Sequence, residues 1–482
     1  MTIPCGGTHI LVFPYPAQGH MLALLDLTHQ LVIRGLTITI LVTPKNLPIL
    51  NPLLSRHPSS IKTLILPFPS HPSVPAGVEN VKDLPDNSFI SAMVSALRQL
   101  HDPLLLWFRS HPSPPSAIIS DLFLGWTHHL ACQLNIPRIV FSPSGAAFVS
   151  LINCLWRETP QRDDPNDPDF PVSFPKVPGS PIYPWRQLSF VYRSYVRGDP
   201  EWELIRDDYL ANMASWGIVF NSFSELERDY LVHLEKDLGH DQVWAVGPLL
   251  PPDDDPTAPS ERGGSNSISA RDIISWLDKR EENSVIYVCF GSQAVLSNEQ
   301  IEALAVGLEQ SGVHFIWCIK EATVGHVVGK YGVVPSGFED RAAERGLVIR
   351  GWAPQVSILR HRAVGSFLTH CGWNSVLEGI VAGVALLAWP MTADQFADAK
   401  LLEEVGVGMK VCEGAETVPN SVVLAKAMTE SVSGKGSKRE KAVELQKAAL
   451  DAIKEGGSSS KDLDLFVKDL SGSKIEFGGK NA

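Results

Sequence analysis

Residues 352–395 read WAPQVSILRHRAVGSFLTHCGWNSVLEGIVAGVALLAWPMTADQ, and the rest of the chain is interpreted from this stretch. The apolar runs LVIRGW (347–352) and AVGSFLTH (363–370) are typical of buried strands, and NSVLEGIVAG (374–383) is predicted to form a short helix. A strand that leads through a glycine turn into a helix directs unpaired backbone N–H groups and the positive end of the helix dipole to one edge of the sheet. The stretch therefore predicts an anion-binding site at that edge.

Side chains around this turn suit a nucleoside diphosphate. His370 follows the predicted strand, Asn374 and Ser375 begin the predicted helix, and all three can donate hydrogen bonds to phosphate oxygens. Trp352 offers a flat apolar face for a base, and stacking of this kind contributes about 1–3 kcal/mol per base. Trp352 and Trp373 would also be ordinary as core or edge aromatics.

The remaining polar side chains suit a ribose and a sugar. Glu378 lies one helical turn further on and can accept hydrogen bonds from two adjacent ribose hydroxyls, while Asp394 and Gln395 remain for the sugar. Two alternatives need no ligand. Ser375-x-x-Glu378 is also the pattern of a capping box, and Asp394 would be a sound N-cap for the helix predicted to follow it.

Composition indicates a globular protein large enough for two domains. The chain has 482 residues, 44% of them hydrophobic and 20% charged. The net charge of -12 argues against a nucleic-acid partner, because there is no basic stripe to release counterions from phosphates. No run reaches the roughly 18 apolar residues of a spanning helix, and the start has no signal-peptide pattern, so we expect no stable membrane insertion.

The seven cysteines indicate a reducing compartment. Their number is odd, they lack CxxC spacing, and several lie in apolar runs, so we expect buried free thiols and a cytosolic protein. No HExxH, EF-hand or GxxxxGK[ST] pattern occurs, so nothing in the sequence requires a metal.

The first half of the chain has the pattern of a doubly wound parallel sheet. An apolar run at 9–13, a Pro/Gly-rich loop, a helical pattern and an apolar run at 37–43 form a β-loop-α-β unit. Further strands are predicted at residues 117–121, 138–142, 217–222 and 242–248. Residues 157–185 are rich in Pro and Asp, and we expect them to form an irregular surface segment bordering a substrate cleft.

Two polar residues are predicted to meet at the rim of this sheet. His20 follows the first strand and Asp121 ends another, and the carboxyl ends of parallel strands share one edge. An Asp beside a His fixes the imidazole tautomer and stabilises the imidazolium, which suits a general base. The alternative for His20 is an ordinary polar residue at a helix start.

The second half repeats the α/β pattern after an acidic, Gly/Ser-rich linker at residues 251–269. Strands are predicted at 284–292 and 314–320, with a helix at 298–312 between them. The first of these strands ends in Gly291 and Ser292, where it again faces a helix start, so these residues and Gln293 can add donors to a diphosphate.

The 352–395 stretch closely resembles the signature box of plant family 1 UDP-glycosyltransferases, and FPYPAQGH (13–20) gives a second match. The residues that match the box are Trp352, Ala353, Pro354, Gln355, His370, Cys371, Gly372, Trp373, Asn374, Ser375, Glu378, Pro390, Asp394 and Gln395. The resemblance implies an α/β protein of the GT-B fold, with two facing Rossmann-like doubly wound parallel-sheet domains and an interdomain cleft.

The resemblance also implies that different segments of the chain bind the acceptor and the UDP-sugar. Residues 1–250 would bind the acceptor, 251–270 would be the linker, 271–455 would bind the UDP-sugar, and 456–482 would form a tail helix that packs back on the first domain. It implies an inverting O-glycosyltransferase that acts as a monomer on a flavonoid or small phenolic, without a cofactor or metal.

The family pattern assigns roles to residues of this sequence. His20 would deprotonate the acceptor and Asp121 would orient His20. The expected donor-binding residues are Ser292, Trp352, Ala353, Gln355, His370, Gly372, Trp373, Asn374, Ser375, Glu378, Asp394 and Gln395. The expected acceptor-binding residues are Gln18, Phe123 and Leu124, together with parts of the 180–200 segment.

The resemblance favours glucose as the transferred sugar and UDP-glucose as the donor. A Gln at the position of Gln395 usually accompanies glucose in this family, but Pro143, within Ser142-Pro143-Ser144, departs from the pattern of many glucosyl enzymes. UDP-rhamnose and UDP-xylose are therefore the alternatives. An NAD-dependent dehydrogenase is disfavoured because no GxGxxG follows the first strand. A UDP-sugar-binding protein without turnover is disfavoured because His20 and Asp121 are both present.

Overall fold

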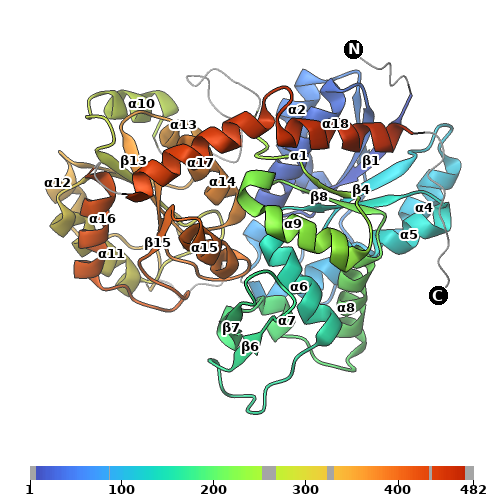
Figure 1. Ribbon diagram of the computed structural model, residues 1–482, viewed down its shortest axis with the longest axis horizontal. Helices are drawn as coiled ribbons and strands as arrows, with labels where there is room; N and C mark the ends of the chain where they lie inside the picture. The colour runs from blue at the N-terminus through green and yellow to red at the C-terminus, as the bar shows by residue number, and fades with distance from the viewer. Residues whose placement is uncertain (1–6, 86, 252–267, 323–329, 434–436, 473–482) are drawn as a thin grey trace. The chain divides into compact units, whose positions relative to one another are not determined.

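The computed structural model describes residues 7–85, 87–251, 268–322, 330–433 and 437–472. The chain divides into two compact units, Met1–Leu250 with Ala452–Ala482 and Pro251–Asp451 (Figure 1). The second division therefore falls within helix α17 (Ser437–Ile453), a little before the expected boundary at 455. Most of the expected linker, residues 252–267, lies outside the described residues, and its last residue already begins helix α10 (Ala270–Asp278).

The first unit contains a seven-stranded parallel sheet in the order β3-β2-β1-β4-β5-β8-β9. Its strands are β1 (His9–Phe13), β2 (Thr37–Val42), β3 (Ile61–Ile65), β4 (Ala117–Asp121), β5 (Arg138–Ser142), β8 (Gly217–Phe220) and β9 (Val243–Ala245). The sheet grows outward in one direction from β1 and in the other from β4, so the strand order reverses between these neighbours. In doubly wound sheets this switch point is where ligands bind.

The strands predicted for this half are confirmed, and β3 is an addition. β3 is the edge strand, and only one of its five residues is buried, so IKTLI gives a weak strand pattern. Residues 157–185 also differ from the expected irregular segment. They contain β6 (Pro171–Ser173) and β7 (Ile182–Pro184), a two-stranded antiparallel sheet whose three-residue strands are too short to produce a readable alternation.

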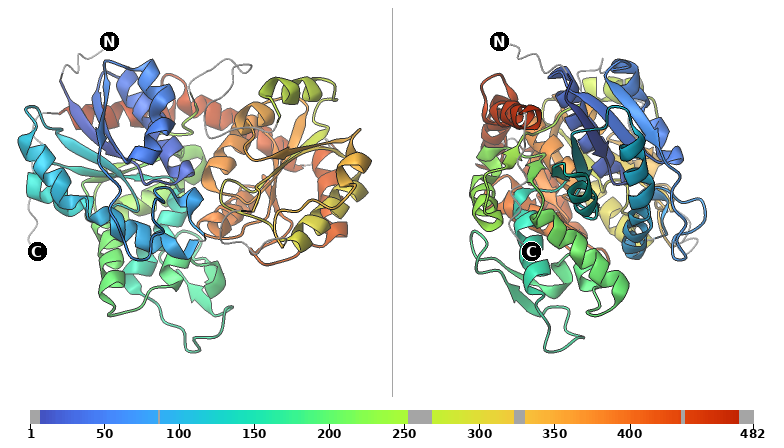
Figure 2. Two further views of the ribbon diagram at one scale, coloured as in Figure 1. Left: turned by 180° about the vertical axis from the view of Figure 1, so that it is seen from behind. Right: turned by 90° about the vertical axis from the view of Figure 1, so that its right-hand side faces the viewer.

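Helices cover both faces of the first sheet, as the right-hand view of Figure 2 shows for the blue strands. They are α1 (Gln18–Ile33), α2 (Asn51–Arg56), α3 (Ile90–Arg98), α4 (His101–Ser110), α5 (Thr127–Leu134), α6 (Ala146–Glu158), α7 (Phe190–Arg193), α8 (Pro200–Met213), α9 (Ser224–Leu238) and α18 (Ser458–Ser471). The tail helix α18 belongs to this unit because Leu463, Phe466 and Leu470 are buried in the same apolar core as β1 and β2. The ring of Phe466 packs 4.9 Å from that of Trp244 in β9.

The second unit contains a six-stranded parallel sheet in the order β12-β11-β10-β13-β14-β15. Its strands are β10 (Val285–Cys289), β11 (His314–Ile319), β12 (Gly346–Arg350), β13 (Val364–Thr369), β14 (Ala385–Ala388) and β15 (Gly408–Lys410). Its further helices are α11 (Asn298–Ser311), α12 (Phe338–Ala342), α13 (Gln355–Leu359), α14 (Trp373–Ala382), α15 (Gln395–Glu404) and α16 (Ser421–Val432). The strand order reverses between β10 and β13, so this sheet also has a switch point.

The cysteines only partly match the expectation of buried thiols. All six described cysteines are free, but Cys132 is exposed and Cys412 is only partly buried. Cys5 lies outside the described residues. Across the described ranges, no helix combines the length and the hydropathy needed to span a membrane.

Candidate functional site

A histidine and a carboxylate meet at the switch point of the first sheet. His20 lies in the first turn of α1, directly after β1, and Asp121 is the last residue of β4. Because β1 and β4 are paired neighbours, with Phe13 opposite Ser120, the two side chains reach the same edge. His20 Nδ1 lies 2.9 Å from Asp121 Oδ2. The predicted pair is therefore in hydrogen-bond contact.

The surroundings of Asp121 fix the tautomer of His20. Asp121 is completely buried, and its Oδ1 accepts a hydrogen bond of 2.9 Å from the backbone N–H of Phe123. The carboxylate oxygens are acceptors only, so His20 Nδ1 must carry the proton that faces Oδ2. The neutral ring then presents Nε2 as a proton acceptor, and 22% of the His20 side chain is exposed. This is the arrangement that a general base requires.

Aromatic rings surround the imidazole. Phe123 stacks on His20 with ring centroids 5.3 Å apart and planes inclined by 15°, and the ring of Tyr15 lies 5.5 Å from His20 and 4.9 Å from Phe123. Phe123 also lines a small pocket. The other residues that line it are Ile90, Ser91, Val94, Leu122, Val191, Ile205, Asp208 and Tyr209. The lining of this small pocket is mostly apolar.

The three residues expected to bind the acceptor lie in different environments. Phe123 lines the pocket, and Gln18 is partly exposed in the first turn of α1. The structure does not support Leu124 as an acceptor-binding residue, because its side chain is completely buried and cannot contact a ligand at the surface of this unit. The tight turn after β4 directs its side chain into the core, with Thr127 donating to the Leu124 carbonyl.

Most of the residues that line the pocket lie outside the segments expected to bind the acceptor. Val191 falls in the expected 180–200 segment, but α3 and α8 supply the larger part. The side chains that these helices contribute form no recognisable motif, and only the tertiary packing of α3 against α8 brings them to one pocket.

The second unit presents a helix N-terminus at its own switch point. β13 leads through Gly372, the N-cap, into α14, so Asn374 and Ser375 lie in the first helical turn as predicted. Ser375 is therefore three residues into the helix, and the Ser375-x-x-Glu378 pattern is not a capping box. Instead, Gln355 Nε2 donates to Ser375 Oγ at 3.0 Å and to Glu378 Oε2 at 2.7 Å. These bonds join the WAPQ segment to the helix.

His370 is enclosed by glycines at this edge. A Cβ atom on Gly291 or on Gly372 would lie 2.6 Å from His370 Nε2, so both positions require the absence of a side chain. His370 Nδ1 is buried without a hydrogen-bond partner among the described residues, although part of the residue is accessible. Burial lowers the pKa of His370 to about 4. At neutral pH it is an uncharged imidazole that can donate one hydrogen bond.

The other expected donor-binding residues are divided between surface and core. Ser292 is exposed beyond β10, and Trp352 is partly exposed before α13. Ala353 is 5% exposed and Trp373 only 2%, so their side chains belong to the core and their backbones alone remain for a ligand. For Trp373 this matches the alternative of an ordinary core aromatic.

Asp394 and Gln395 lie at the start of α15. Asp394 occupies the N-cap position but its side chain makes no capping hydrogen bond, so the N-cap alternative is not observed. Gln395 Oε1 accepts hydrogen bonds from the backbone N–H groups of Met391 at 2.9 Å and Thr392 at 3.0 Å. These bonds fix the orientation of the Gln395 carboxamide, so its NH₂ group remains to donate a hydrogen bond to a ligand.

Comparison with known proteins agrees with this geometry. The family model described as UDP-glucoronosyl and UDP-glucosyl transferase matches residues 264–449. UDP-glycosyltransferase 89B2 of Stevia rebaudiana is 59% identical over 96% of this chain and 98% of its own. Flavonol 3-O-glucosyltransferase UGT89B1 of Arabidopsis thaliana is 57% identical over 96% of both chains.

Solved structures show the same fold. The crystal structure of Arabidopsis thaliana UGT89C1 complexed with UDP-L-rhamnose is 41% identical, covers 96% of this chain and 99% of that one, and superposes with a TM-score of 0.80. Another crystal structure of that protein is complexed with quercetin, with 40% identity, coverage of 96% and 100%, and a TM-score of 0.78. The predicted family and fold are confirmed. The chain therefore belongs to the plant family 1 UDP-glycosyltransferases and has their two-domain GT-B fold.

Proposed function

We propose that this enzyme transfers glucose from UDP-glucose to a phenolic hydroxyl of a flavonoid, with inversion at the anomeric carbon. The observation that carries the proposal is the contact of 2.9 Å between His20 and the buried Asp121, beside an aromatic wall. A relative with 57% identity is named a flavonol 3-O-glucosyltransferase, and a structure with 40% identity holds quercetin, which supports the class of acceptor.

In the proposed reaction His20 is the general base. The phenol loses its proton to His20 Nε2 while its oxygen forms the bond to the anomeric carbon, and the bond from that carbon to the UDP oxygen breaks on the opposite face. A phenol has a pKa of about 10, so it needs help to ionise at neutral pH. Base assistance of this kind typically contributes about 10²–10⁴-fold. Asp121 holds Nδ1–H and stabilises the imidazolium that forms.

The departing diphosphate would be stabilised by the second unit. The N-terminus of α14 offers backbone N–H groups and a partial positive charge, and His370, Asn374 and Ser375 add side-chain donors. We propose that these groups suffice without a cofactor or a metal. Addition of a chelator should then leave the transfer rate unchanged, and a loss restored by Mg²⁺ would contradict the proposal.

Glucose is the proposed sugar because Gln395 presents a fixed NH₂ donor. UDP-rhamnose is the main alternative, since the UGT89C1 structure with 41% identity was solved with it, and UDP-xylose remains a third. The Ser142 hydroxyl donates to the Ser144 carbonyl at 2.7 Å, so this hydroxyl is already hydrogen-bonded within its own strand end. We expect Gln395→His to shift preference away from UDP-glucose when donors compete, and an unchanged product ratio would remove Gln395 from sugar recognition.

The proposal is tested by incubating the enzyme with UDP-glucose and a hydroxylated flavonol and measuring the mass of the product. We expect a product heavier by one hexose, which His20→Ala abolishes while UDP binding persists. Product only with UDP-rhamnose or UDP-xylose would reassign the donor. Equal turnover by His20→Ala would remove His20 from the mechanism, and binding of UDP-sugar without any turnover would favour the non-catalytic alternative.

We also propose that the enzyme is a monomer in the cytosol. The free thiols of the described cysteines support a reducing compartment. Light scattering after gel filtration tests the monomer, and imaging of a fluorescent fusion in plant cells tests the location.

A further inference from the structure

The turn that follows β4 carries two residues of the proposed active site. It contains Asp121, which holds His20, and Phe123, which stacks on His20. The turn is closed by a hydrogen bond of 2.9 Å from the Leu124 N–H to the Asp121 carbonyl. Any displacement of this short segment would move both the carboxylate and the aromatic wall relative to the imidazole.

Arg138 supports the turn from the neighbouring strand β5. It is 1% exposed, and its Nη2 donates to the Asp121 carbonyl at 3.1 Å, while Nε donates to Ser120 Oγ at 2.9 Å. Nη1 donates to Asn212 Oδ1 at 2.6 Å and to Ser215 Oγ at 2.9 Å. Burial lowers the pKa of Arg138 to about 9, so the guanidinium is still charged at neutral pH. Burial of a charged guanidinium costs free energy unless it is hydrogen-bonded, and all three nitrogens of Arg138 donate hydrogen bonds here.

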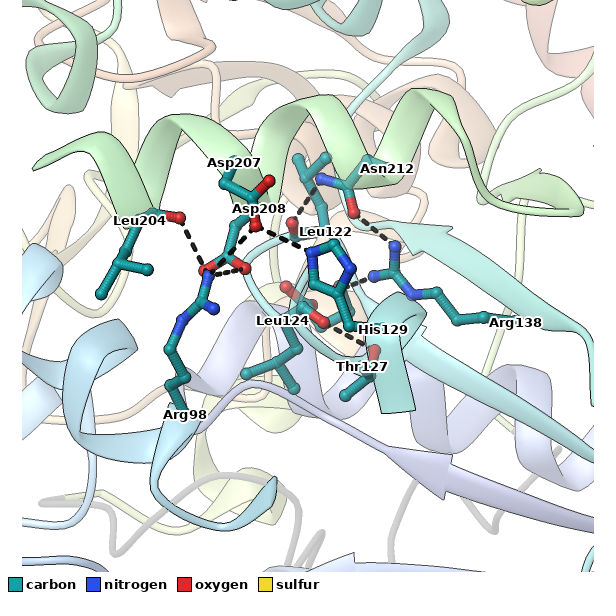
Figure 3. Close-up of polar contacts among 11 residues, drawn as sticks. Arg98, Leu122, Leu124, Thr127, His129, Arg138, Leu204, Asp207, Asp208 and Asn212 are labelled. Atoms are coloured by element: carbon teal, nitrogen blue, oxygen red, sulfur yellow. Dashed lines mark hydrogen bonds and ion pairs between the residues drawn. The ribbon is translucent and has the colours of Figure 1, made fainter. Parts of the chain in front are cut away.

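Asn212 supports the same turn from helix α8. Its Nδ2 donates to the Leu122 carbonyl at 2.8 Å, while its Oδ1 accepts from Arg138 (Figure 3). The turn also lies directly on α8, because a Cβ atom on Gly125 would be 1.9 Å from the Asp208 carbonyl oxygen. Asp208 and Asn212 are one helical turn apart and therefore face the turn together. Arg138 and Asn212 therefore donate hydrogen bonds to two consecutive backbone carbonyls, those of Asp121 and Leu122.

We propose that Arg138 and Asn212 form a brace that positions the catalytic turn, and that they act on the reaction only through the backbone of Asp121 and Leu122. This inference rests on the proposed roles of His20 and Asp121. Neither residue of the brace contacts the imidazole in the described structure, so both are positioning residues. A contribution to folding stability alone is the competing explanation.

The substitution Asn212→Asp separates the two explanations. An aspartate keeps an oxygen for Arg138 Nη1 but replaces the NH₂ group that donates to the Leu122 carbonyl. Ser215→Ala is the matched control, because it removes another partner of Arg138 Nη1. The Ser215 hydroxyl otherwise donates to the Ala211 carbonyl of helix α8, so the substitution removes no hydrogen bond to the turn. We expect Asn212→Asp to lower kcat by about 10- to 100-fold, with KM for the UDP-sugar within twofold of wild type, and Ser215→Ala to stay within twofold in both constants.

A second measurement tests the turn directly. Amide hydrogen exchange of residues 122–126 should be faster in Asn212→Asp and unchanged in Ser215→Ala, at a temperature where both are folded. Unchanged exchange in this segment would overturn the brace, whatever the activity. If Asn212→Asp does not fold, Asn212→Ala removes both contacts without adding charge and is measured in the same way.

A double-mutant cycle tests whether the brace acts through Asp121. In the background of Asp121→Ala, the substitution Asn212→Asp should lower kcat by a smaller factor than it does in wild type, because the carboxylate that the turn positions is already absent. Fully additive losses would overturn the inference. If His20→Ala retains full activity, the proposed function fails on its own account, whereas the exchange measurement still decides whether the brace holds the turn.

Discussion

Asp121→Asn tests the proposed base through its tautomer. Both carboxylate oxygens are occupied, Oδ2 by His20 Nδ1 and Oδ1 by the backbone N–H of Phe123. A carboxamide has only one oxygen, and the backbone N–H of Phe123 can only donate, so the oxygen should turn to Phe123. The NH₂ group would then face His20 Nδ1, which must accept, and the proton moves to Nε2. A histidine in that form cannot take a proton from the acceptor.

The expected loss follows from the contribution of general-base catalysis. That contribution is about 10²–10⁴-fold, which corresponds to about 3–5 kcal/mol in the activation free energy. Asp121→Ala leaves His20 Nδ1 without any partner, so both tautomers become accessible. We therefore expect Asp121→Asn to be at least as slow as Asp121→Ala, even though asparagine is the more conservative change.

The assay is the initial rate of product formation at saturating UDP-sugar and acceptor, with the melting temperature of each variant as a check on folding. Binding of UDP by calorimetry should be unchanged, because the proposed diphosphate site is built from residues of the second unit. A rate for Asp121→Asn within twofold of wild type would refute the reasoning, and so would an Asp121→Asn enzyme much faster than Asp121→Ala.

Three further predictions concern other parts of the chain. Gly372→Ala should weaken UDP binding by at least tenfold in calorimetry, because its Cβ would lie 2.6 Å from His370 Nε2, and unchanged affinity would show that the imidazole can move aside. Tyr15→Phe should leave the melting temperature unchanged or raise it, because the Tyr15 hydroxyl is buried without a hydrogen-bond partner among the described residues. A loss of acceptor affinity in this variant would instead give the hydroxyl a role in binding. His370 has a folded pKa of about 4 against about 6.5 when unfolded, so its contribution to stability is complete above pH 6.5 and decreases as the unfolded chain takes up a proton toward pH 4. At pH 5 the decrease amounts to at most about 2 kcal/mol, and His370→Gln should accordingly lose less stability than wild type between pH 7 and pH 5 in denaturant titrations.

The sequence by itself was sufficient for the family, the two parallel sheets and the approach of His20 to Asp121. Strands such as 9–13 and 117–121 are buried on both faces, so they appear as continuous apolar runs whose ends mark the sheet edge. His20 and Asp121 each follow or end such a run, and the parallel arrangement is enough to bring them together. The glycine turn before α14 could be located for the same reason, because strand, turn and helix are adjacent along the chain.

Other features depended on contacts between segments that are distant in sequence. Leu124 follows Phe123 by one position, yet one side chain lines the pocket and the other is in the core, which only the geometry of the turn decides. Ser375 and Glu378 matched a capping box, but α14 has its N-cap at Gly372, and the side chain of Gln355 donates to both residues instead.

No sequence pattern indicates the proposed brace on the turn that follows β4. Arg138, Asn212 and Leu122 come from a strand, a helix and a loop, and nothing in their local patterns indicates that they meet. Local sequence determines which backbone groups a segment must satisfy and which side chains it offers. The tertiary structure decides the pairing, because a buried donor takes whichever acceptor the packing of distant elements places within hydrogen-bond reach.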